Sequence, residues 1–514
     1  MKRHILLFLL LIFSFGYSQL ADNQLDSLVK RAIQKFDVPG ISLGIIENGK
    51  IIYAKGHGVR SINNQKPMNE NTLVGIASNS KGFTCFAIGM LVDEGKINWD
   101  DKVRTYIPEF KMYDPFVSEE FTIRDLVTHR SGLSLGAGDL MFFPEGNDMS
   151  IDELIQGVSH LKPESSFRSK FRYNNNLYNI AGEVIRRVSG LEWAEFIEKR
   201  ILEPVGMKNS KGSYHRVTDR SNIIEAHAPV NGKIQQIPHD WSQLADAAGG
   251  IVSNITDMLI WADFLMKGAV TKDGKQLLSD KQMHELWTLQ TPIPIAKNNP
   301  YNSRFYGYGL GWFLSDVAGT LEVQHSGGLI GTVTKFTLLP DKQIGIVILT
   351  NQQSGAAFSA INNAIKDSYL GFENRDWIKR YGDRMDEYFA DVNTKKASIF
   401  EKAIQFQAKG IFNDSKNMIG DYSDAWLGDI LITEKDKSLW INFKNQPQLI
   451  GELIPYNSTT YIAKWTNRSF DADAFLLFNF DENGKATGFN MKPISDITDF
   501  SFDFVDLDVK RKKD

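Results

Sequence analysis

The stretch Val74-Gly75-Ile76-Ala77-Ser78-Asn79-Ser80-Lys81-Gly82-Phe83-Thr84 decides the fold of this 514-residue chain. Small residues lead into an apolar run, which predicts a helix from Lys81 to Glu94 ended by Gly95. A serine in the first turn of such a helix lies beside its free backbone N–H groups. A lysine three residues further on lies on the same helix face. We therefore predict that Ser78 is a nucleophile and that Lys81 is its proton partner.

This pairing works only if the pKa of Lys81 is lowered. A hydroxyl near its free pKa is a poor nucleophile, and an amine accepts its proton only where burial or nearby positive charge lowers the amine pKa. Ser-x-x-Lys alone is a weak pattern, since it also occurs at Ser27/Lys30 and Ser159/Lys162. Ser27 lies inside a predicted amphipathic helix and Ser159 lies near a helix end, so neither context supplies an activated hydroxyl.

Tyr173-Asn174-Asn175 is the second candidate element, and it is the only Tyr-x-Asn among 16 tyrosines. A tyrosine close to a lysine can have a lowered pKa, act as general base toward the serine and then protonate the leaving group. Asn175 offers an amide that orients the lysine and the substrate. The alternative is an asparagine-rich surface turn.

His325-Ser326-Gly327-Gly328 follows a predicted strand and is the third element. Glycines allow a substrate backbone to approach closely. The N–H of Gly328 is expected to pair with that of Ser78 as an oxyanion hole, at about 3 kcal/mol per donor. The alternative is a structural histidine before a turn. Gly132-Leu133-Ser134-Leu135-Gly136 fits Gly-x-Ser-x-Gly, but its surroundings predict a loop, so Ser134 is not expected to be catalytic.

Strand signals at both ends of the first 370 residues enclose a helical middle. A helix is predicted over 22–36, and Asn48-Gly49 joins two β-rich runs as a hairpin. Residues 75–290 are mainly helices and loops, strands return at 322–325, 333–338 and 344–350, and a helix follows at 356–369. A charged helical pattern over 374–411 precedes short β-rich runs between 420 and 505, which predict a small antiparallel barrel or sandwich. We predict an α+β fold, with a signal peptide at 1–18, a main domain at 19–370, a helical linker at 371–414 and a β-domain at 415–514.

Composition excludes several function classes. A net charge of -4, with 42% hydrophobic and 23% charged residues, favours a globular protein without nucleic-acid partners. Lys2 and Arg3 before the apolar run 5–15 indicate a signal peptide cleaved after Ser18, which predicts a periplasmic or secreted protein without a membrane anchor. Cys85 is the only cysteine, so no internal disulfide forms. The absence of metal-ligand spacings predicts no metal and no cofactor.

The three elements, in this order, resemble the serine β-lactamase and penicillin-binding-protein superfamily, in particular class C β-lactamases, D-aminopeptidases and family VIII esterases. The resemblance covers about residues 22–370. Supporting stretches are 122–133, Pro204-Val205-Gly206-Met207, Ala248-Gly249-Gly250-Ile251 and Tyr308-Gly309-Leu310-Gly311-Trp312. It implies a β-lactamase/transpeptidase-like antiparallel sheet flanked by helices, with an all-helical subdomain. The C-terminal region resembles the lipocalin-like domain appended to some of these hydrolases.

The resemblance implies Ser78 as nucleophile, Lys81 as proton partner, Tyr173 as general base, and Asn175, His325, Gly327 and Gly328 as substrate-binding or oxyanion positions. The chain departs from the β-lactamases at His325, where they usually carry a lysine that binds the drug's carboxylate. A histidine is mostly neutral near pH 7, so this anchor is weakened. We expect an acyl-enzyme hydrolase of esters or short peptides, including those with D-residues. The alternatives are a β-lactamase, a penicillin sensor that turns over slowly, and an envelope-binding protein; homo-oligomers are compatible with each.

Overall fold

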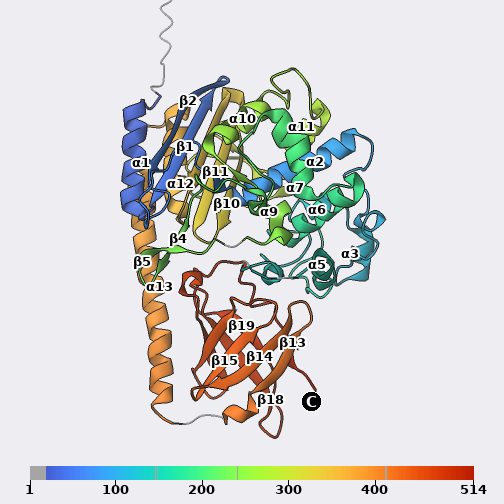
Figure 1. The fold of residues 1–514 in the computed structure, drawn as a ribbon, viewed down its shortest axis with the longest axis vertical. Coiled ribbons are helices and arrows are strands. Elements are labelled where there is room, and N and C mark those ends of the chain that lie inside the picture. The colour runs from blue at the N-terminus through green and yellow to red at the C-terminus, as the bar shows by residue number, and fades with distance from the viewer. Residues whose placement is uncertain (1–18, 145, 148, 240, 411–413, 514) are drawn as a thin grey trace, which may run out of the picture.

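The computed structural model describes residues 19–144, 146–147, 149–239, 241–410 and 414–513. The predicted signal peptide at 1–18 lies outside these residues. Figure 1 shows two bodies, a larger mixed domain and a β-barrel beneath it, with one long helix beside both. No helix within the described ranges is long and apolar enough to cross a membrane.

The main domain is built on an antiparallel sheet whose strands come from distant parts of the chain. Its spatial order is β2-β1-β12-β11-β10-β9-β8-β7. The N-terminal hairpin pairs directly with β12, about 300 residues later in the chain, because β1 and β12 are both buried throughout most of their length. The strands are β1 (Gly40–Glu47), β2 (Lys50–Gly58), β7 (Thr291–Pro292), β8 (Tyr306–Tyr308), β9 (Phe313–Val317), β10 (Thr320–Leu329), β11 (Thr332–Leu339) and β12 (Ile344–Thr350).

The hairpin turn forms as the Asn-Gly signal predicts. Asn48 and Gly49 have φ of 48° and 75°, so both residues of the two-residue loop adopt the left-handed region. This is the turn whose twist matches that of paired strands.

Helices cover both faces of the sheet. On one face, α1 (Asp22–Phe36) packs with α12 (Gly355–Leu370), and on the other α10 (Ile255–Met266) packs on β1 and β12. The helical subdomain stands beside the sheet and includes α2 (Ser80–Asp93), α3 (Pro115–Glu120), α4 (Ile123–Leu126), α5 (Ile151–Val158), α6 (Asn176–Ser189), α7 (Trp193–Ile197), α8 (Glu203–Val205), α9 (Asp246–Gly249) and α11 (Asp280–Leu286).

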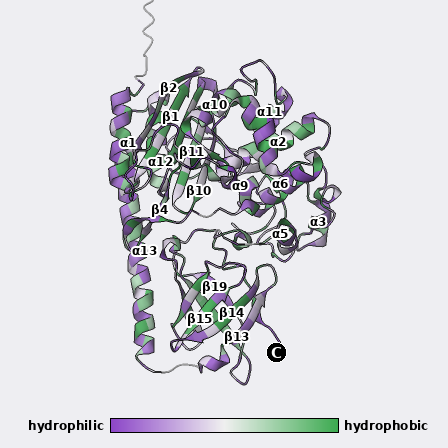
Figure 2. Ribbon diagram, viewed as in Figure 1, coloured by the Kyte–Doolittle hydropathy of each residue, from purple (hydrophilic) through white to green (hydrophobic). Residues whose placement is uncertain are grey.

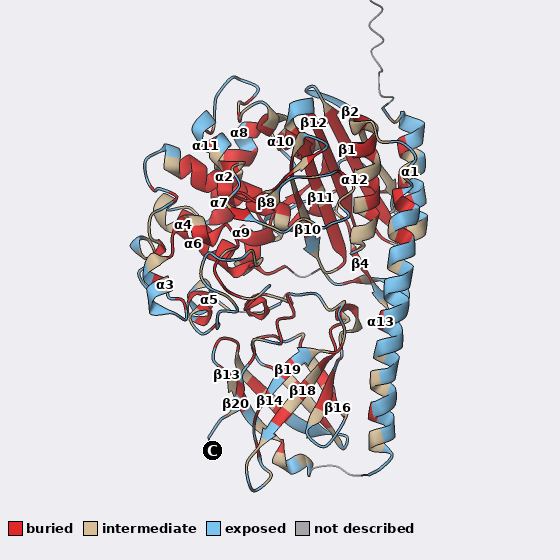
Figure 3. Ribbon diagram, turned by 180° about the vertical axis from the view of Figure 1, so that it is seen from behind, coloured by how far each residue is buried: buried red, intermediate tan, exposed pale blue. Residues whose placement is uncertain are grey.

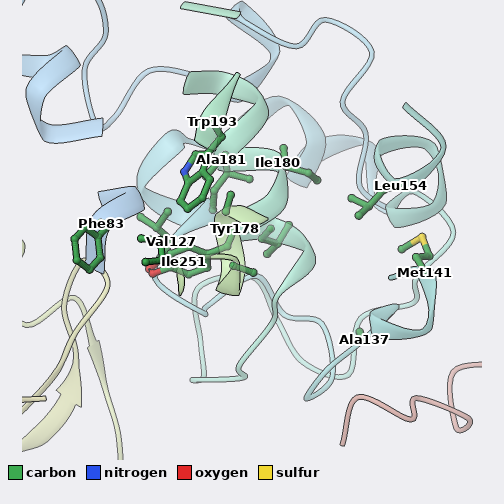
Figure 4. Packing of buried hydrophobic residues seen from close by; sticks show 14 of the residues in the cluster. Phe83, Val127, Ala137, Met141, Leu154, Tyr178, Ile180, Ala181, Trp193 and Ile251 are labelled. Atoms are coloured by element: carbon green, nitrogen blue, oxygen red, sulfur yellow. The ribbon is translucent and has the colours of Figure 1, made fainter. Parts of the chain in front are cut away.

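The core of the helical subdomain fixes α2 in place. Every residue of α2 from Ser80 to Leu91 is buried, and Figure 4 shows the side chains of Tyr178, Ile251 and Trp193 gathered close to this helix. Gly82 touches the sheet side, where a Cβ atom would lie 2.3 Å from Cζ2 of Trp312. Close packing therefore sets the direction in which the start of α2 points.

The C-terminal domain is a closed eight-stranded barrel in sequence order, with β13 pairing with β20 to close it. Of the two predicted alternatives for this domain, a barrel or a sandwich, the structure shows the barrel. The strands are β13 (Gly420–Asp424), β14 (Gly428–Lys435), β15 (Ser438–Phe443), β16 (Ile450–Pro455), β17 (Thr460–Trp465), β18 (Ala474–Phe480), β19 (Ala486–Pro493) and β20 (Val509–Arg511).

Helix α13 (Trp377–Gln407) runs alongside both bodies. Few of its residues are buried, and Figure 3 shows most of the helix exposed. Figure 2 shows that α13 mixes hydrophilic and hydrophobic residues along its length. The predicted α+β fold, with its flanked antiparallel sheet, helical subdomain and C-terminal β-domain, is confirmed.

Candidate active site

Ser78 lies in the short 3₁₀ turn η1 (Ala77–Asn79) that leads into α2, one step earlier than the first helical turn predicted for it. Ala77 has φ of 51°, a conformation that costs a non-glycine residue about 1–2 kcal/mol. Neighbouring contacts hold this turn: Ile76 N–H donates to the Ile251 carbonyl at 2.8 Å, and Asn79 Nδ2 donates to Thr334 Oγ1 at 2.8 Å. The turn leaves Ser78 partly exposed in a cavity.

Lys81 is fully buried and points back at Ser78. Its Nζ lies 3.0 Å from Ser78 Oγ, 2.8 Å from Asn175 Oδ1 and 2.8 Å from the Ala248 carbonyl oxygen. Burial lowers the pKa of the amine to about 7, against the opposing charge of Asp139. A substantial share of Lys81 is therefore neutral near pH 7 and able to accept the Ser78 proton.

Tyr173 lies in the loop before α6, with Lys81 Nζ 4.9 Å from its ring centroid. The loop is fixed by the Asn174 N–H, which donates to His129 Nδ1 at 3.1 Å. Burial raises the pKa of the phenol well above its usual value, and a hydrogen bond with Ser78 opposes this only in part. The expected lowering of this pKa is wrong, since the desolvation cost of a phenolate outweighs its partners. In the free protein Tyr173 is a neutral hydroxyl facing Ser78.

Asn175 is buried, which rules out the surface-turn alternative for this triplet. While its Oδ1 accepts from Lys81, its Nδ2 donates to Asp139 Oδ2 at 2.8 Å. Burial raises the pKa of Asp139 to about 7. Ser501, from the barrel, donates to the same Asp139 oxygen at 2.8 Å.

His325 is buried on β10 beside Tyr173, with the ring centroids 6.2 Å apart. Its Nδ1 lies 2.6 Å from the Ser326 carbonyl oxygen, which only accepts, so Nδ1 carries the proton. Its Nε2 lies 3.1 Å from the Tyr308 hydroxyl. Burial lowers the histidine pKa to about 3, so the ring is neutral and offers no cationic anchor.

The two glycines after Ser326 lie against the nucleophile turn. A Cβ atom at Gly327 would lie 2.3 Å from the Ile76 carbonyl oxygen, so only glycine allows β10 to approach the turn this closely. Gly328 is exposed and lines the same cavity as Ser78. Strand β9 pairs with β10 only from Thr320 to Gln324. Among the described strand pairings, the edge of β10 beside the glycines on the β9 side therefore has no partner strand and is open to a ligand.

The cavity has a volume of about 1190 Å³ and receives residues from the main domain, α13 and the barrel. Its walls are rich in aromatic rings, namely Phe36, Phe142, Phe143, Phe171, Tyr173, Trp241, Phe313, Phe389, Phe470, Phe500 and Phe502. The lysines and the arginine in the lining, Lys35, Lys396 and Arg468, each form an ion pair with an aspartate. An apolar acyl group suits such walls better than an anionic one.

The other serines considered as nucleophiles, and the single cysteine, lie away from the site or have structural roles. Ser27 is exposed on α1 and Ser159 caps the end of α5. Ser134 lies in a loop, as predicted, and its hydroxyl donates to Asp506. Cys85 is buried, and burial raises the pKa of its thiol to about 12, which makes it unreactive. Among the described residues no cluster of His, Cys, Asp and Glu is suited to a metal ion.

Three contributors escaped the sequence reasoning: Asp139, Ser501 and the Ala248 carbonyl. Ala248 begins the Ala-Gly-Gly-Ile stretch that supported the family resemblance, and that stretch was a sequence signal for this part of the site. Asp139 and Ser501 are 362 positions apart and belong to no motif. Only the packing of the barrel on the main domain brings them together.

Residues 25–370 match the family described as Beta-lactamase, and residues 415–511 match a domain of unknown function, DUF3471. Unguisins hydrolase ungD of Aspergillus violaceofuscus (strain CBS 115571) is 24% identical over 401 residues, which is 72% of this chain and 70% of that protein. Another curated relative is matched over only 64% of its own length, less than two thirds.

Two solved structures share the fold. The octameric penicillin-binding protein homologue from Pyrococcus abyssi has a TM-score of 0.61 at 22% identity, covering 93% of this chain and 99% of that one. A class C beta-lactamase has a TM-score of 0.56 at 20% identity, covering 70% of this chain and 100% of that one. The first likeness extends over the barrel as well as the main domain, while the second is limited to about the length of the main domain. With its family match spanning two thirds of the sequence, this chain belongs to the beta-lactamase family of serine hydrolases.

Proposed function

We propose that this protein is an exported hydrolase that cleaves esters or amide bonds of short peptides, including those with D-residues, through an acyl-enzyme on Ser78. The observation that carries the proposal is the position of Lys81, a buried amine with a pKa of about 7 whose Nζ lies 3.0 Å from Ser78 Oγ. An amine with a pKa near 7 beside a hydroxyl supplies, near neutral pH, the activating base that this chemistry needs.

The reaction is proposed in two halves. Ser78 Oγ attacks the substrate carbonyl while Lys81 accepts its proton, and the oxyanion is stabilised by the Ser78 and Gly328 N–H groups. The bond to the leaving group then breaks, and the proton reaches that group from Lys81 through the Tyr173 hydroxyl. In the second half a water molecule attacks the acyl-ester carbonyl and gives a proton to the neutral Lys81 amine. The bond to Ser78 Oγ then breaks, Oγ takes the proton back from Lys81, and the acid is released.

Lys81 takes the place of Tyr173 as the first proton acceptor in this scheme. Because burial raises its pKa, the Tyr173 phenol stays protonated in the free protein and cannot act as the first base. It can instead donate its proton to the leaving group and receive another from Lys81, which is the role of a relay.

The preference for neutral substrates rests on the site's charges. His325 stands where a β-lactamase carries its cationic anchor, and burial keeps its ring neutral. The aromatic walls of the cavity favour apolar acyl groups. Hydrolysis of β-lactam drugs is the second candidate function, favoured by the fold shared with a class C beta-lactamase.

Export and assembly belong to the same proposal. The charged start and apolar run within residues 2–18 support a periplasmic or secreted location. A homo-oligomer is supported only by the fold shared with an octameric homologue, and light scattering of the mature chain tests it.

A fluorescent phosphonate probe tests the nucleophile. Wild type and the matched Ser27→Ala variant should be labelled, because Ser27 shares the Ser-x-x-Lys spacing but is exposed on α1. Ser78→Ala should not be labelled, and labelling of that variant would remove Ser78 from the reaction. Time courses with p-nitrophenyl esters, D-alanyl anilides and nitrocefin then rank the substrates. A stoichiometric burst without turnover on every substrate would favour a penicillin sensor instead.

A further inference from the structure

The segment between β19 and β20, residues 494–508, leaves the barrel and lies between it and the main domain, where Figure 1 draws it in red. Asp499, Phe500, Ser501 and Phe502 of this segment line the same cavity as Ser78. The C-terminal domain therefore contributes part of the wall around the nucleophile.

A chain of three hydrogen bonds joins this segment to the amine of Lys81. Ser501 Oγ donates to Asp139 Oδ2 at 2.8 Å, and Asn175 Nδ2 donates to that oxygen at 2.8 Å. Asn175 Oδ1 in turn accepts from Lys81 Nζ at 2.8 Å. The three linking side chains are all buried, with Asp139 fully so.

The direction of the chain fixes the Asn175 amide. Its oxygen faces Lys81 because its nitrogen must donate, and Asp139 Oδ2 is the acceptor placed to receive it. Asp139 Oδ2 therefore accepts two hydrogen bonds, one from Asn175 and one from Ser501. The Ser501 hydroxyl also opposes protonation of Asp139, since a hydrogen bond to a carboxylate lowers its pKa.

The glycine-rich loop 132–138, left without a role by the reaction, is the surface on which this segment docks. Ser134 donates to Asp506, and the Gly138 N–H donates to Asp503 Oδ2 at 2.6 Å. Gly136 has φ of 71°, and a Cβ atom there would lie 2.7 Å from the Phe500 ring.

The same loop connects the docked segment to the phenol. The Gly136 N–H donates to the Tyr173 carbonyl at 2.9 Å. The Phe500 ring meets the Tyr173 ring edge-on at a centroid distance of 6.0 Å. The docked segment therefore contacts Tyr173 directly through the Phe500 ring, and it is linked to Lys81 through the hydrogen bonds of Asp139 and Asn175.

We infer that Ser501 of the barrel is a positioning residue of the hydrolytic site, which acts through Asp139 and Asn175 to hold the Lys81 amine against Ser78. This rests on the proposed function, since it gives that same site a residue from the second domain. The Gly-x-Ser-x-Gly stretch then serves as a docking loop, and the barrel is part of the catalytic unit.

The test measures the rate of phosphonate labelling at Ser78 against pH in the full-length mature chain. In Ser501→Ala, labelling at pH 7 should slow by about tenfold, the equivalent of one hydrogen bond to a charged group. The midpoint of its acid limb should also move to lower pH, because a more protonated Asp139 stabilises the Lys81 cation less. A merely structural serine would not move that midpoint.

Two comparisons sharpen the test. Ser501→Thr keeps the hydroxyl and should restore both the rate and the midpoint. Ser495→Ala removes a hydroxyl from the same segment, outside the cavity lining, and should match wild type. The other titratable groups facing this region, Asp499, Asp503, Asp506, His129 and His325, are unchanged in every variant, so they shift all the profiles equally.

The outcomes separate the two claims. If Ser78 is labelled and Ser501→Ala matches wild type in rate and midpoint, the positioning role is overturned while the proposed function stands. If wild type is not labelled at Ser78, both fall. Should Ser501→Ala not fold, as judged by its melting curve, Ser501→Cys replaces it; a thiol is a weak donor, so a rate and midpoint equal to wild type would again overturn the role.

Discussion

The main-chain carbonyl of Ala248 accepts a hydrogen bond from Lys81 Nζ at 2.8 Å. A carbonyl has no proton to give, so one of the donor positions of the amine is directed at the backbone. Ser78 Oγ and Asn175 Oδ1 occupy two further directions around the nitrogen. The amine is therefore fixed in direction by backbone, helix and loop together, although burial disfavours its charge.

The acylation rate should depend on the protonation of Lys81. Because its pKa is lowered to about 7 and only the neutral amine accepts the Ser78 proton, the rate should rise with pH through about 7. Labelling at pH 5 should be about a hundredfold slower than at pH 8 or above. Stopped-flow labelling over this range checks it, and a flat profile would contradict the role of Lys81.

The lowered pKa of Lys81 should also make the free energy of unfolding depend on pH. The folded pKa of Lys81, about 7, lies below the value of 10.5 for an unperturbed lysine, so the unfolded chain binds the extra proton between these values. Stability of the wild type should therefore rise as the pH is raised from 7 toward 10, and Lys81→Met should reduce that rise. Urea titrations at several pH values measure both slopes. Equal slopes would show that Lys81 keeps an ordinary pKa.

Local patterns predicted the parts of this protein that are local in sequence. Asn48-Gly49 gave the hairpin because both residues accept positive φ, and Ser78 with Lys81 gave the nucleophile pair because one helical turn separates them. Tyr173 was found through its asparagine neighbours. These signals lie within a few residues of each other.

The remaining parts depend on contacts between distant segments. The direction of the Tyr173 pKa shift was missed because burial, which decides it, is a property of the assembled domain. The stretch that begins at Ala248 was noticed in the sequence, but its contact with Lys81 was missed because the contact is made by a backbone carbonyl, which has no residue-type signature. Ser501 was missed because a lone serine in a loop becomes informative only when the barrel docks beside Asp139.

Tyr173→Phe should lower the acylation rate by about 10²–10³-fold, because the variant loses the hydroxyl that relays the proton. Its acid limb should stay near pH 7, since Lys81 remains the titrating base. Tyr106→Phe is the matched control, because the Tyr106 hydroxyl donates to Asp101 away from the cavity. A Tyr173→Phe enzyme with full activity would exclude the phenol from the reaction.

His325→Gln should leave the shape of the pH profile unchanged. Burial lowers the histidine pKa to about 3, so the ring stays neutral throughout pH 5–9, and glutamine keeps both a donor and an acceptor. Ester turnover measured across this range checks the expectation. Loss of a limb near pH 6–7 in the variant would instead assign that limb to His325.

Gly136→Ala and Gly190→Ala form a matched pair for the contact between the domains. Both glycines have positive φ, 71° and 74°, so each alanine has a similar backbone cost of about 1–2 kcal/mol. Only at Gly136 does the new Cβ meet a neighbour, at 2.7 Å from the Phe500 ring, whereas nothing lies within 4 Å at Gly190. Gly136→Ala should therefore lose about 1–3 kcal/mol more stability by denaturant titration, because the ring must move. It should also slow phosphonate labelling of Ser78, while Gly190→Ala should label at the wild-type rate. Equal losses in the two variants would mean that Phe500 does not pack on this loop in solution.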